Sequence, residues 1–156
     1  MDIFSLLPLL KGWTYEYRPI ETKTINKGDT IPVDNFSGEG WLLSIVTYAA
    51  DNYVQPKLYI DDIPMPSDTI LAMYNNGETT ETPHRGWLTK YDAGSTTYRH
   101  QYIGKIPRPF KKQVKLDCSL TSAGGTTANV TCEILYIKII DRKAFNKSLR
   151  AVLSHD

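Results

Sequence analysis

Few side chains in this sequence have a type and spacing that could carry out chemistry. The histidines His84, His100 and His155 are far apart along the chain, and none lies at a metal-ligand spacing from another or in a nucleophile motif. The sequence also lacks a glycine-rich phosphate loop and the motifs of serine hydrolases and zinc proteases. We therefore expect each histidine to lie in a loop or on the surface, and we expect no catalytic residue, no metal and no cofactor.

The two cysteines, Cys118 and Cys132, lie in one segment of alternating apolar and polar residues, VKLDCSLTSAGGTTANVTCEILYIKII. Both are equally distant in sequence from Gly125, which follows Gly124 in a turn-like stretch. A symmetric β-hairpin around these glycines would place the cysteines opposite each other on one face. They would then be either two buried thiols or a cross-strand disulfide, because no histidine accompanies them and the spacing does not fit a zinc site.

Beyond Ile134 in the same segment, the apolar residues change their alternation. Leu135, Ile137 and Ile139 form the apolar set there, and Tyr136 lies on the opposite side. This pattern predicts a β-bulge near Ile134 that shifts the inward phase of the strand.

Charge is unevenly distributed along a chain whose net charge is only +1. Residues 51–82 contain six acidic residues and one basic residue, whereas residues 99–115 contain basic charges alone. These segments are either solvated faces or two complementary contact surfaces in an assembly. Binding of nucleic acid to residues 104–115 is a weaker interpretation, because the segment lacks an array of stacking aromatic residues. The basic set is Arg99, Lys105, Arg108, Lys111, Lys112 and Lys115.

Short strand-like segments make up most of the chain. Ten tyrosines and a period-two apolar pattern favour strands, and turn clusters such as NKGD, YNNGE and SAGG recur at intervals of about 8 to 15 residues. This spacing predicts an all-β chain, an antiparallel β-sandwich of jelly-roll type, rather than a βαβ fold. The expected strands are 13–18, 31–33, 41–48, 57–61, 69–74, 86–91, 97–103, 113–121 and 128–140.

The two ends of the chain differ from the predicted sandwich. The N-terminal segment is an apolar arm that Pro8 interrupts, and it lacks the basic region and cleavage site of a signal peptide. Near the other end, Asp141 can cap a helix in which Phe145, Leu149 and Val152 share one apolar face. The predicted organisation is an apolar arm (1–12), a β-sandwich domain (13–140) and a C-terminal amphipathic helix (141–156).

The predicted strand 41–48 is apolar on both faces. Alternation places Trp41, Leu43 and Ile45 on one face and Leu42, Val46 and Tyr48 on the other. One face would pack on the core, and the arm, the C-terminal helix or another subunit must cover the second. We expect the following Asp51-Asn52-Tyr53 to be a connection, because Asp and Asn side chains bond to nearby backbone. The expected partner contacts are Ile3, Phe4, Leu6, Leu7, Leu42, Val46, Tyr48 and Tyr53.

The stretch GEGWLLSIVTYAADNYVQPKLYIDD, residues 38–62, resembles a pattern in small accessory structural proteins of tailed phages and other viruses. In those proteins a glycine-flanked strand is followed by an Asp-Asn turn and by a strand that ends in Ile-Asp-Asp or Ile-Asp-Gly. The resemblance implies a β-sandwich subunit at a capsid, neck or tail, with an apolar arm for docking. It implies no catalytic residues.

These features favour a non-enzymatic structural subunit of a large assembly, most concretely a virion protein of capsid, decoration, neck or tail. Its partners would be identical copies and a shell or tail protein. The alternative is a carbohydrate-binding β-sandwich module in which Trp13, Trp41 and Trp87 stack on sugars. The near-neutral charge does not indicate nucleic acid, and no run approaches the about 18 apolar residues of a membrane span. We expect localisation in a virion or, outside a virus, a soluble protein.

Overall fold

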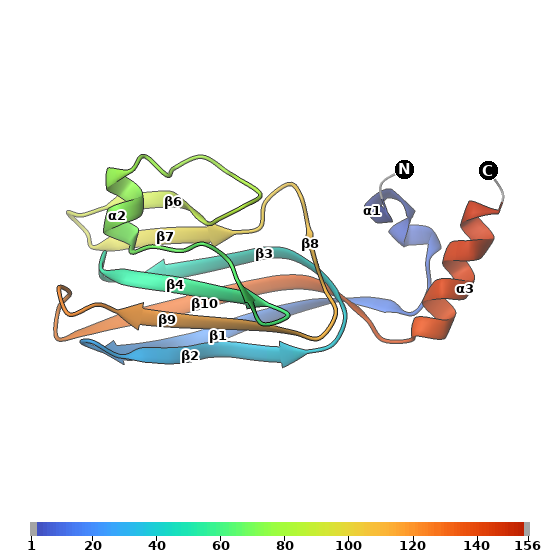
Figure 1. The fold of residues 1–156 in the computed structure, drawn as a ribbon, viewed down its shortest axis with the longest axis horizontal. Helices are drawn as coiled ribbons and strands as arrows, with labels where there is room; N and C mark the ends of the chain where they lie inside the picture. Colours follow the sequence, from blue (N-terminus) through green and yellow to red (C-terminus); the bar gives the residue numbers. More distant parts are fainter. Residues whose placement is uncertain (1–2, 155–156) are drawn as a thin grey trace.

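The chain forms a β-sandwich with a small helical lobe at one end (Figure 1). This is a computed structural model, and it describes residues 3–154. The large sheet has the order β1-β10-β3-β7-β6, with β8 paired to β3, and the small sheet has the order β2-β9-β4-β5. Every strand pair is antiparallel. The predicted antiparallel β-sandwich is confirmed.

The elements follow one another in this order. They are α1 (Ile3–Leu6), the 3-10 helix η1 (Leu7–Leu9), β1 (Trp13–Asn26), β2 (Thr30–Ser37), β3 (Gly40–Ala49), β4 (Val54–Ile60), β5 (Ile63–Pro64), α2 (Ile70–Asn75), β6 (Trp87–Asp92), β7 (Thr97–Tyr102), β8 (Arg108–Phe110), β9 (Gln113–Leu120), β10 (Thr127–Ile139) and α3 (Arg142–Leu153).

The winding of the chain is that of a jelly roll. The first strand pairs with the last, β1 with β10, and the second pairs with the second-to-last, β2 with β9. β3 then lies beside β10 in the large sheet, and β4 lies beside β9 in the small sheet. The first four strands therefore alternate between the two sheets, so each of their connections crosses from one layer to the other.

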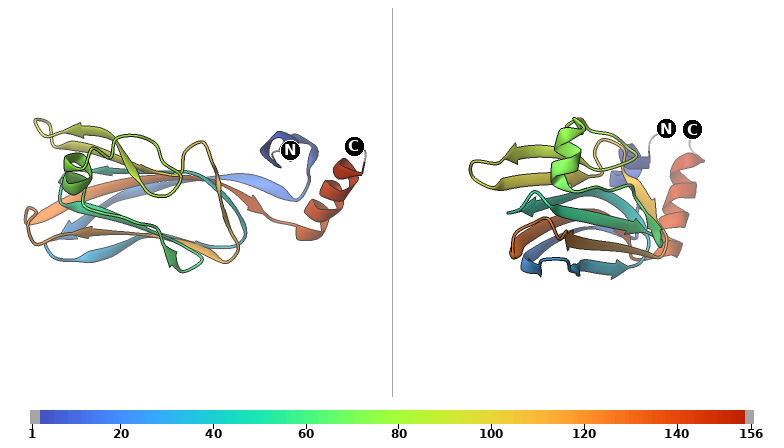
Figure 2. Two further views of the ribbon diagram at one scale, coloured as in Figure 1. Left: turned by 45° about the horizontal axis from the view of Figure 1, so that its top comes forward. Right: turned by 60° about the vertical axis from the view of Figure 1, so that its left-hand side comes forward.

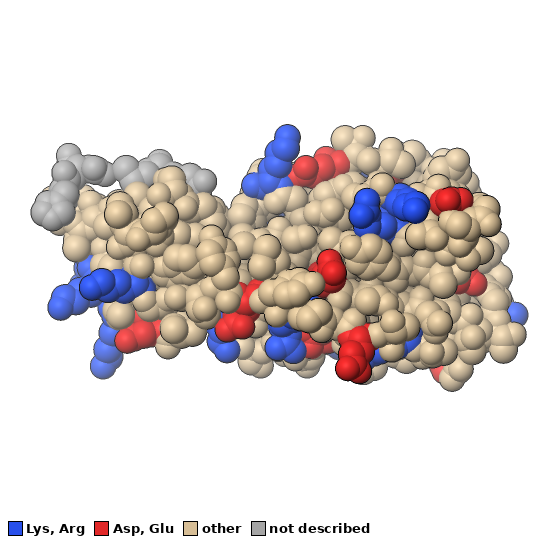
Figure 3. Space-filling view, turned by 180° about the vertical axis from the view of Figure 1, so that it is seen from behind, with Lys and Arg blue, Asp and Glu red and all other residues tan. Residues whose placement is uncertain are grey.

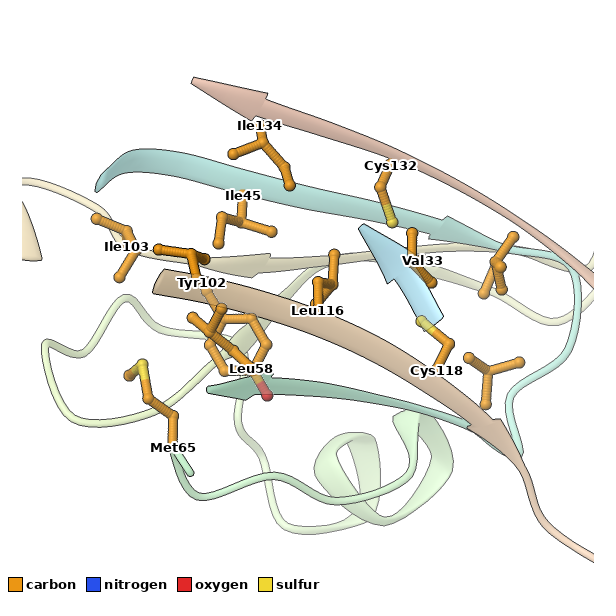
Figure 4. Close-up of a cluster of buried hydrophobic side chains, with 14 of the residues drawn as sticks. Val33, Ile45, Leu58, Met65, Tyr102, Ile103, Leu116, Cys118, Cys132 and Ile134 are labelled. Atoms are coloured by element: carbon orange, nitrogen blue, oxygen red, sulfur yellow. The ribbon is translucent and has the colours of Figure 1, made fainter. Parts of the chain in front are cut away.

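The main core lies between the sheets and contains the inward-facing half of each strand. Along β9, Val114, Leu116 and Cys118 are buried at alternate positions. Figure 4 shows such side chains entering the cluster from both layers. An aromatic group extends this core, with Phe36 stacked on Tyr136 at 4.3 Å between ring centroids.

The predicted strand at residues 69–74 is wrong, because these residues form the helix α2. Thr69 caps the helix by accepting a hydrogen bond from the Ala72 N–H at 3.2 Å. Ile70 and Met73 are spaced for one helical face, and both are buried in the main core. A short apolar run such as TILAMY fits a buried strand and a buried helical turn equally well, and tertiary packing decides between them.

The predicted change of phase within β10 is also wrong. β10 alternates regularly, with Ile134 and Tyr136 facing the main core and Leu135 and Ile137 facing away from it. An irregularity does lie near Ile134, as predicted, because the pairing with β3 shifts between Leu135 and Tyr136. The residue left out of the pairing is Leu43 of β3, so β10 keeps its phase. The outward residues at this end are apolar because a second cluster covers that face.

Gly40 provides a test of how closely β3 and β10 approach each other. A Cβ atom at this position would overlap the backbone carbonyl oxygen of Ile137, and neither backbone can move without breaking the sheet. We expect Gly40→Ala to lower the free energy of unfolding by about 2 kcal/mol or more, as measured by urea denaturation.

Gly94→Ala is the matched control, because the nearest atom to its added Cβ is Asp92 Oδ1 at an ordinary 3.4 Å. This change should alter stability by less than about 0.5 kcal/mol. Equal effects of the two substitutions would contradict the close packing of β3 on β10.

Candidate functional site

A second hydrophobic cluster lies outside the sandwich, where the two ends of the chain meet. We call this region the terminal lobe and define it as residues 3–12, Ile140 and residues 141–154, together with the adjoining ends of β1, β3 and β10. Leu7, Leu10, Ile137 and Phe145 are buried in it. Figures 1 and 2 show α1 and α3 side by side beyond the end of the two sheets. The lobe is therefore a small core of its own, attached to the large sheet.

Hydrogen bonds fix the arm to the start of β1. The Trp13 indole Nε1 donates to the carbonyl oxygens of Leu7 and Leu10, both at 3.1 Å. The Lys11 N–H donates to Ser148 Oγ at 3.0 Å, which connects the arm to α3. The tryptophan ring thus supplies both apolar surface and the donor that satisfies two carbonyl groups of the arm.

Gly12 sets the close contact between the two chain ends. Its carbonyl oxygen accepts hydrogen bonds from the Ile140 and Asp141 N–H groups at 2.9 and 3.1 Å. Its φ of +76° is in the left-handed region, and an added Cβ would overlap the Asp141 carbonyl oxygen. The arm and α3 consequently leave the sheet side by side.

The helix α3 was predicted correctly from its apolar stripe. The Asp141 side chain accepts from the Ala144 N–H at 3.0 Å and caps the helix. Phe145 is buried and lies 5.9 Å from the Trp41 ring, while Leu149 and Val152 pack at the side of the cluster. The arm, the C-terminal helix or another subunit was expected to cover the second face of strand 41–48. The arm and α3 of the same chain both pack against Trp41 and Leu43 on this face.

The lobe exposes large aliphatic residues at its surface. Leu9, Ile140 and Leu153 have 62%, 63% and 52% of their surface accessible. Sequence reasoning did not single out these three residues.

The lobe also carries basic side chains. Lys143, Lys147 and Arg150 are exposed on α3 and have no ion-pair partner among residues 3–154. Arg142 is paired with Glu39. In the space-filling view, basic side chains gather at the lower edge of the lobe, on the left (Figure 3). The exposed surface of the lobe is therefore both apolar and cationic.

The expected contacts from the arm lie in the lobe. Ile3, Phe4 and Leu6 are half-buried against its cluster, whereas Leu7 is buried inside it. Leu7 therefore cannot present a surface to a partner. The arm is mainly an internal element, and only part of its apolar surface remains accessible.

The expected contacts from β3 divide between the two faces of the large sheet. Leu42 is fully buried in the main core, which corrects its assignment to the outward face. The shift in pairing with β10 gives Leu42 and Ile45 the same inward direction. Val46 and Tyr48 are half-buried on the outer face, where Tyr17 is 57% exposed.

Asp51-Asn52-Tyr53 lies in the connection between β3 and β4, as expected. Asp51 Oδ1 accepts from the Tyr53 N–H at 2.7 Å, and Asp51 Oδ2 accepts from the Gly125 N–H at 3.0 Å. Asn52 Nδ2 donates to the Tyr91 hydroxyl at 2.9 Å. Tyr53 packs against the main core. Asp51 therefore joins this connection to the one between β9 and β10, and Asn52 joins it to β6.

The six basic residues from 99 to 115 do not form one surface. Arg99 lies on the outer face of the large sheet, and its Nε donates to Thr89 Oγ1 at 2.8 Å. Lys115 lies on the opposite side of the molecule, on the outer face of the small sheet, with its Nζ 3.1 Å from Asp117 Oδ2. Arg108 is in β8, and Lys105, Lys111 and Lys112 are exposed in connecting segments.

The acidic segment is used largely within the chain. Asp61 accepts hydrogen bonds from the N–H groups of Lys111, Lys112 and Gln113 at 2.9, 2.7 and 3.1 Å. Although burial opposes the shift, these backbone donors lower the pKa of Asp61. Glu81 similarly accepts from the Lys105 N–H. The acidic and basic segments thus meet each other inside one chain.

The cysteines meet, but the predicted hairpin between them is wrong. β9 belongs to the small sheet and β10 to the large sheet, so Cys118 pairs in the ladder with Ile31 and Pro56 and not with Cys132. Both thiols are free and buried, and they point towards each other from different strands (Figure 4). The neighbouring Cys132 thiol and burial raise the pKa of Cys118.

The histidines occupy three different situations. His84 is exposed in a loop, as expected, whereas His155 lies outside the described residues. The expectation that His100 lies in a loop or on the surface is wrong, because this residue is only 1% exposed and faces inward from β7. Neither of its ring nitrogens has a hydrogen-bond partner in the described part of the chain. Burial lowers the pKa of His100 to about 3.

Neither a metal-binding cluster nor a membrane-spanning helix occurs in the described residues. Within residues 3–154, no three His, Cys, Asp or Glu side chains are grouped so that they could hold a metal ion. None of the helices in that range is long and apolar enough to cross a membrane.

Comparisons with known proteins give a distant similarity to solved structures. No protein-family model matches the chain, and no curated protein sequence matches it. Among solved structures, the chain is similar to the crystal structure of the infectious bursal disease virus VP2 subviral particle, with 10% sequence identity and a TM-score of 0.34. The match covers 83% of this chain, which spans only 38% of the VP2 chain. A similarity of this size does not establish a shared function.

The buried His100 predicts how stability depends on pH. Its pKa is near 6.5 in the unfolded chain and about 3 in the folded chain, so the unfolded state binds the proton first as pH falls. Stability is therefore unaffected above pH about 6.5 and falls below it, by about 2 kcal/mol at pH 5. Urea denaturation between pH 7 and pH about 5 measures this loss.

His100→Leu should remove most of this dependence on pH, whereas His84→Leu, which changes an exposed histidine, should retain it. An identical decline of the unfolding free energy in wild type and His100→Leu would show that another group causes it.

Proposed function

We propose that this chain is a non-enzymatic structural subunit of a large assembly, most concretely a viral particle. It docks through the terminal lobe onto further copies of itself and onto a shell or tail protein. The observation that carries this proposal is the lobe, in which both chain ends build an additional core outside a sandwich that is already closed.

The sandwich does not require the lobe for its own core. The main cluster contains residues from both sheets and from α2, and it is separate from the cluster around Leu7, Leu10 and Phe145. A stable sandwich needs no residues before β1 or after β10. The additional residues therefore suggest a second task for this end of the molecule.

The exposed chemistry of the lobe suits contact with protein. Leaving Leu9, Ile140 and Leu153 in water forgoes about 25 cal/mol for each Å² of apolar surface. Exposed aliphatic groups bordered by polar residues are typical of interaction surfaces. Lys143, Lys147 and Arg150 add unpaired positive charge beside them, which favours an acidic surface on the partner and influences orientation.

The fold is compatible with this role, although it does not select it. Double-sheet jelly rolls occur in viral capsid domains and in lectin domains, and one fold can host many functions. The expected sugar platform of tryptophans receives no support. Trp87 is buried, and Trp13 and Trp41 are half-buried against the cluster of the lobe.

The double variant Leu9→Glu/Leu153→Glu tests docking through the lobe. Both side chains are more than half exposed, so the substitutions should leave the melting temperature of the protomer nearly unchanged. Two buried carboxylates in an apolar contact are costly. We therefore expect the wild-type chain to form oligomers in analytical ultracentrifugation and the variant to sediment as a monomer.

Ile63→Glu is the matched control, because Ile63 is 69% exposed in β5, on the sandwich rather than the lobe. It should leave the oligomer intact. A wild-type chain that remains monomeric at the highest attainable concentration, or a control that dissociates as fully as the lobe variant, would overturn self-docking through the lobe.

A further inference from the structure

A pair of stacked tyrosine rings lies at the surface near the edge of the large sheet. Tyr74 of α2 and Tyr91 of β6 are nearly parallel, with 3.8 Å between ring centroids and 9° between ring planes. Tyr98 of β7, which is buried, supports Tyr91 from the inside at 4.9 Å. Tyr74 is 49% exposed. The tyrosines thus form a series of rings that begins in the core and ends at the surface with Tyr74.

The ring pair is held rigidly by neighbouring segments. Ile70 and Met73 anchor α2 in the main core, and the Leu71 N–H donates to the Asn52 carbonyl oxygen at 2.7 Å. The amide of the same Asn52 donates to the Tyr91 hydroxyl at 2.9 Å. The connection between β3 and β4 therefore positions both the helix and the inner ring, so little ordering remains to be done when a ligand binds.

An open groove of about 490 Å³ lies beside these rings. The side chains of Thr79 and Lys90 line it and have no hydrogen-bond or ion-pair partner within residues 3–154. The Thr89 hydroxyl, also in the groove, is already bonded to Arg99. The groove thus combines an aromatic ring with a free hydroxyl and a free ammonium group.

The groove is poorly suited to an added peptide strand. β6 is the edge strand of the large sheet, but its pairing with β7 is irregular between Leu88 and Lys90. The Leu88 N–H is already bonded to the Glu78 carbonyl oxygen. A bulge and a lysine at an edge both oppose strand addition. A single strand of nucleic acid is also a poor fit, because it would require a row of cations along the groove.

We propose that this groove binds a glycan, with one pyranose ring lying on the exposed ring of Tyr74. The less polar face of a pyranose would cover the tyrosine, as apolar surface covers an aromatic ring elsewhere. The hydroxyls around its edge would reach Thr79 and Lys90, and Lys90 favours a sugar that carries a carboxylate. The inference concerns a different end of the molecule from the terminal lobe and does not depend on docking there.

Saturation-transfer NMR on the full-length chain tests the proposal. The probes are methyl β-glucopyranoside, its carboxylate form methyl β-glucuronide, and p-cresol as a planar aromatic compound without a sugar ring. We expect both glycosides to receive saturation, the glucuronide more strongly. Tyr74→Ala should weaken binding about tenfold or more, the usual scale of one lost aromatic contact.

Two further variants separate stacking from general effects. Tyr74→Trp keeps an aromatic face and should retain binding. Tyr17→Ala removes a tyrosine of comparable exposure on the outer face of the large sheet and should leave binding unchanged. Unchanged melting temperatures would show that each variant is folded. Absence of glycoside binding, binding of p-cresol alone, or an equal loss in Tyr17→Ala would each overturn the proposal.

Discussion

The pairing of β1 with β10 is the constraint on which the rest of the molecule depends. The ladder runs from Trp13 opposite Ile139 to Asn26 opposite Thr127, so it joins the two ends of the chain along almost the whole length of the large sheet. The part of this ladder near Ile25 and Ala128 covers the main core. Its outer end carries Trp13 and Ile137 beyond the small sheet, where one face would be bare without a cover. The arm and α3 are that cover, which is why they lie side by side.

This arrangement separates the molecule into two ends with different chemistry. At one end lies the terminal lobe, with exposed aliphatic and basic side chains. At the opposite end of the sandwich lie α2 and β6, with the stacked tyrosines Tyr74 and Tyr91 (Figure 1). In the roles proposed for them, a subunit that docks by its lobe would leave the tyrosine groove free to face outwards. Neither role interferes with the other sterically.

Polar groups inside the sandwich show what the fold tolerates. His100 is buried without a hydrogen-bond partner among residues 3–154, which the neutral imidazole permits at a cost in acid. The thiols of Cys118 and Cys132 are tolerated more easily, because a buried thiol behaves as a small hydrophobic group. Thr47 Oγ1 also lies 3.4 Å from the Cys132 sulfur. Asp61 is satisfied by three backbone N–H groups and organises the connection before β9. The acidic segment seen in the sequence is used in this local way, by backbone N–H groups of the basic segment.

Elements that depend on a local pattern of residues could be predicted from the sequence. The strands at 86–91, 97–103, 113–121 and 128–140 lie within about one residue of β6, β7, β9 and β10, and the capped stripe of Asp141, Phe145, Leu149 and Val152 predicted α3. Alternation and capping are properties of neighbouring residues, so they can be recognised without knowledge of the fold. The turn nature of Asp51-Asn52-Tyr53 is of the same kind.

Only the tertiary structure decided which layer each element joins. Residues equally distant from a turn face each other either within one sheet, as in a hairpin, or across the core between two sheets. The sequence around Gly125 is compatible with both, so it brought Cys118 and Cys132 together correctly but in the wrong geometry. The same ambiguity concealed the inward direction of Leu42 and His100, the helical state of 69–74, and hence the stacking of Tyr74 on Tyr91. Whether one face or both faces of a strand are buried depends on which distant segments pack against them. The alternation of residues along a single strand does not indicate this.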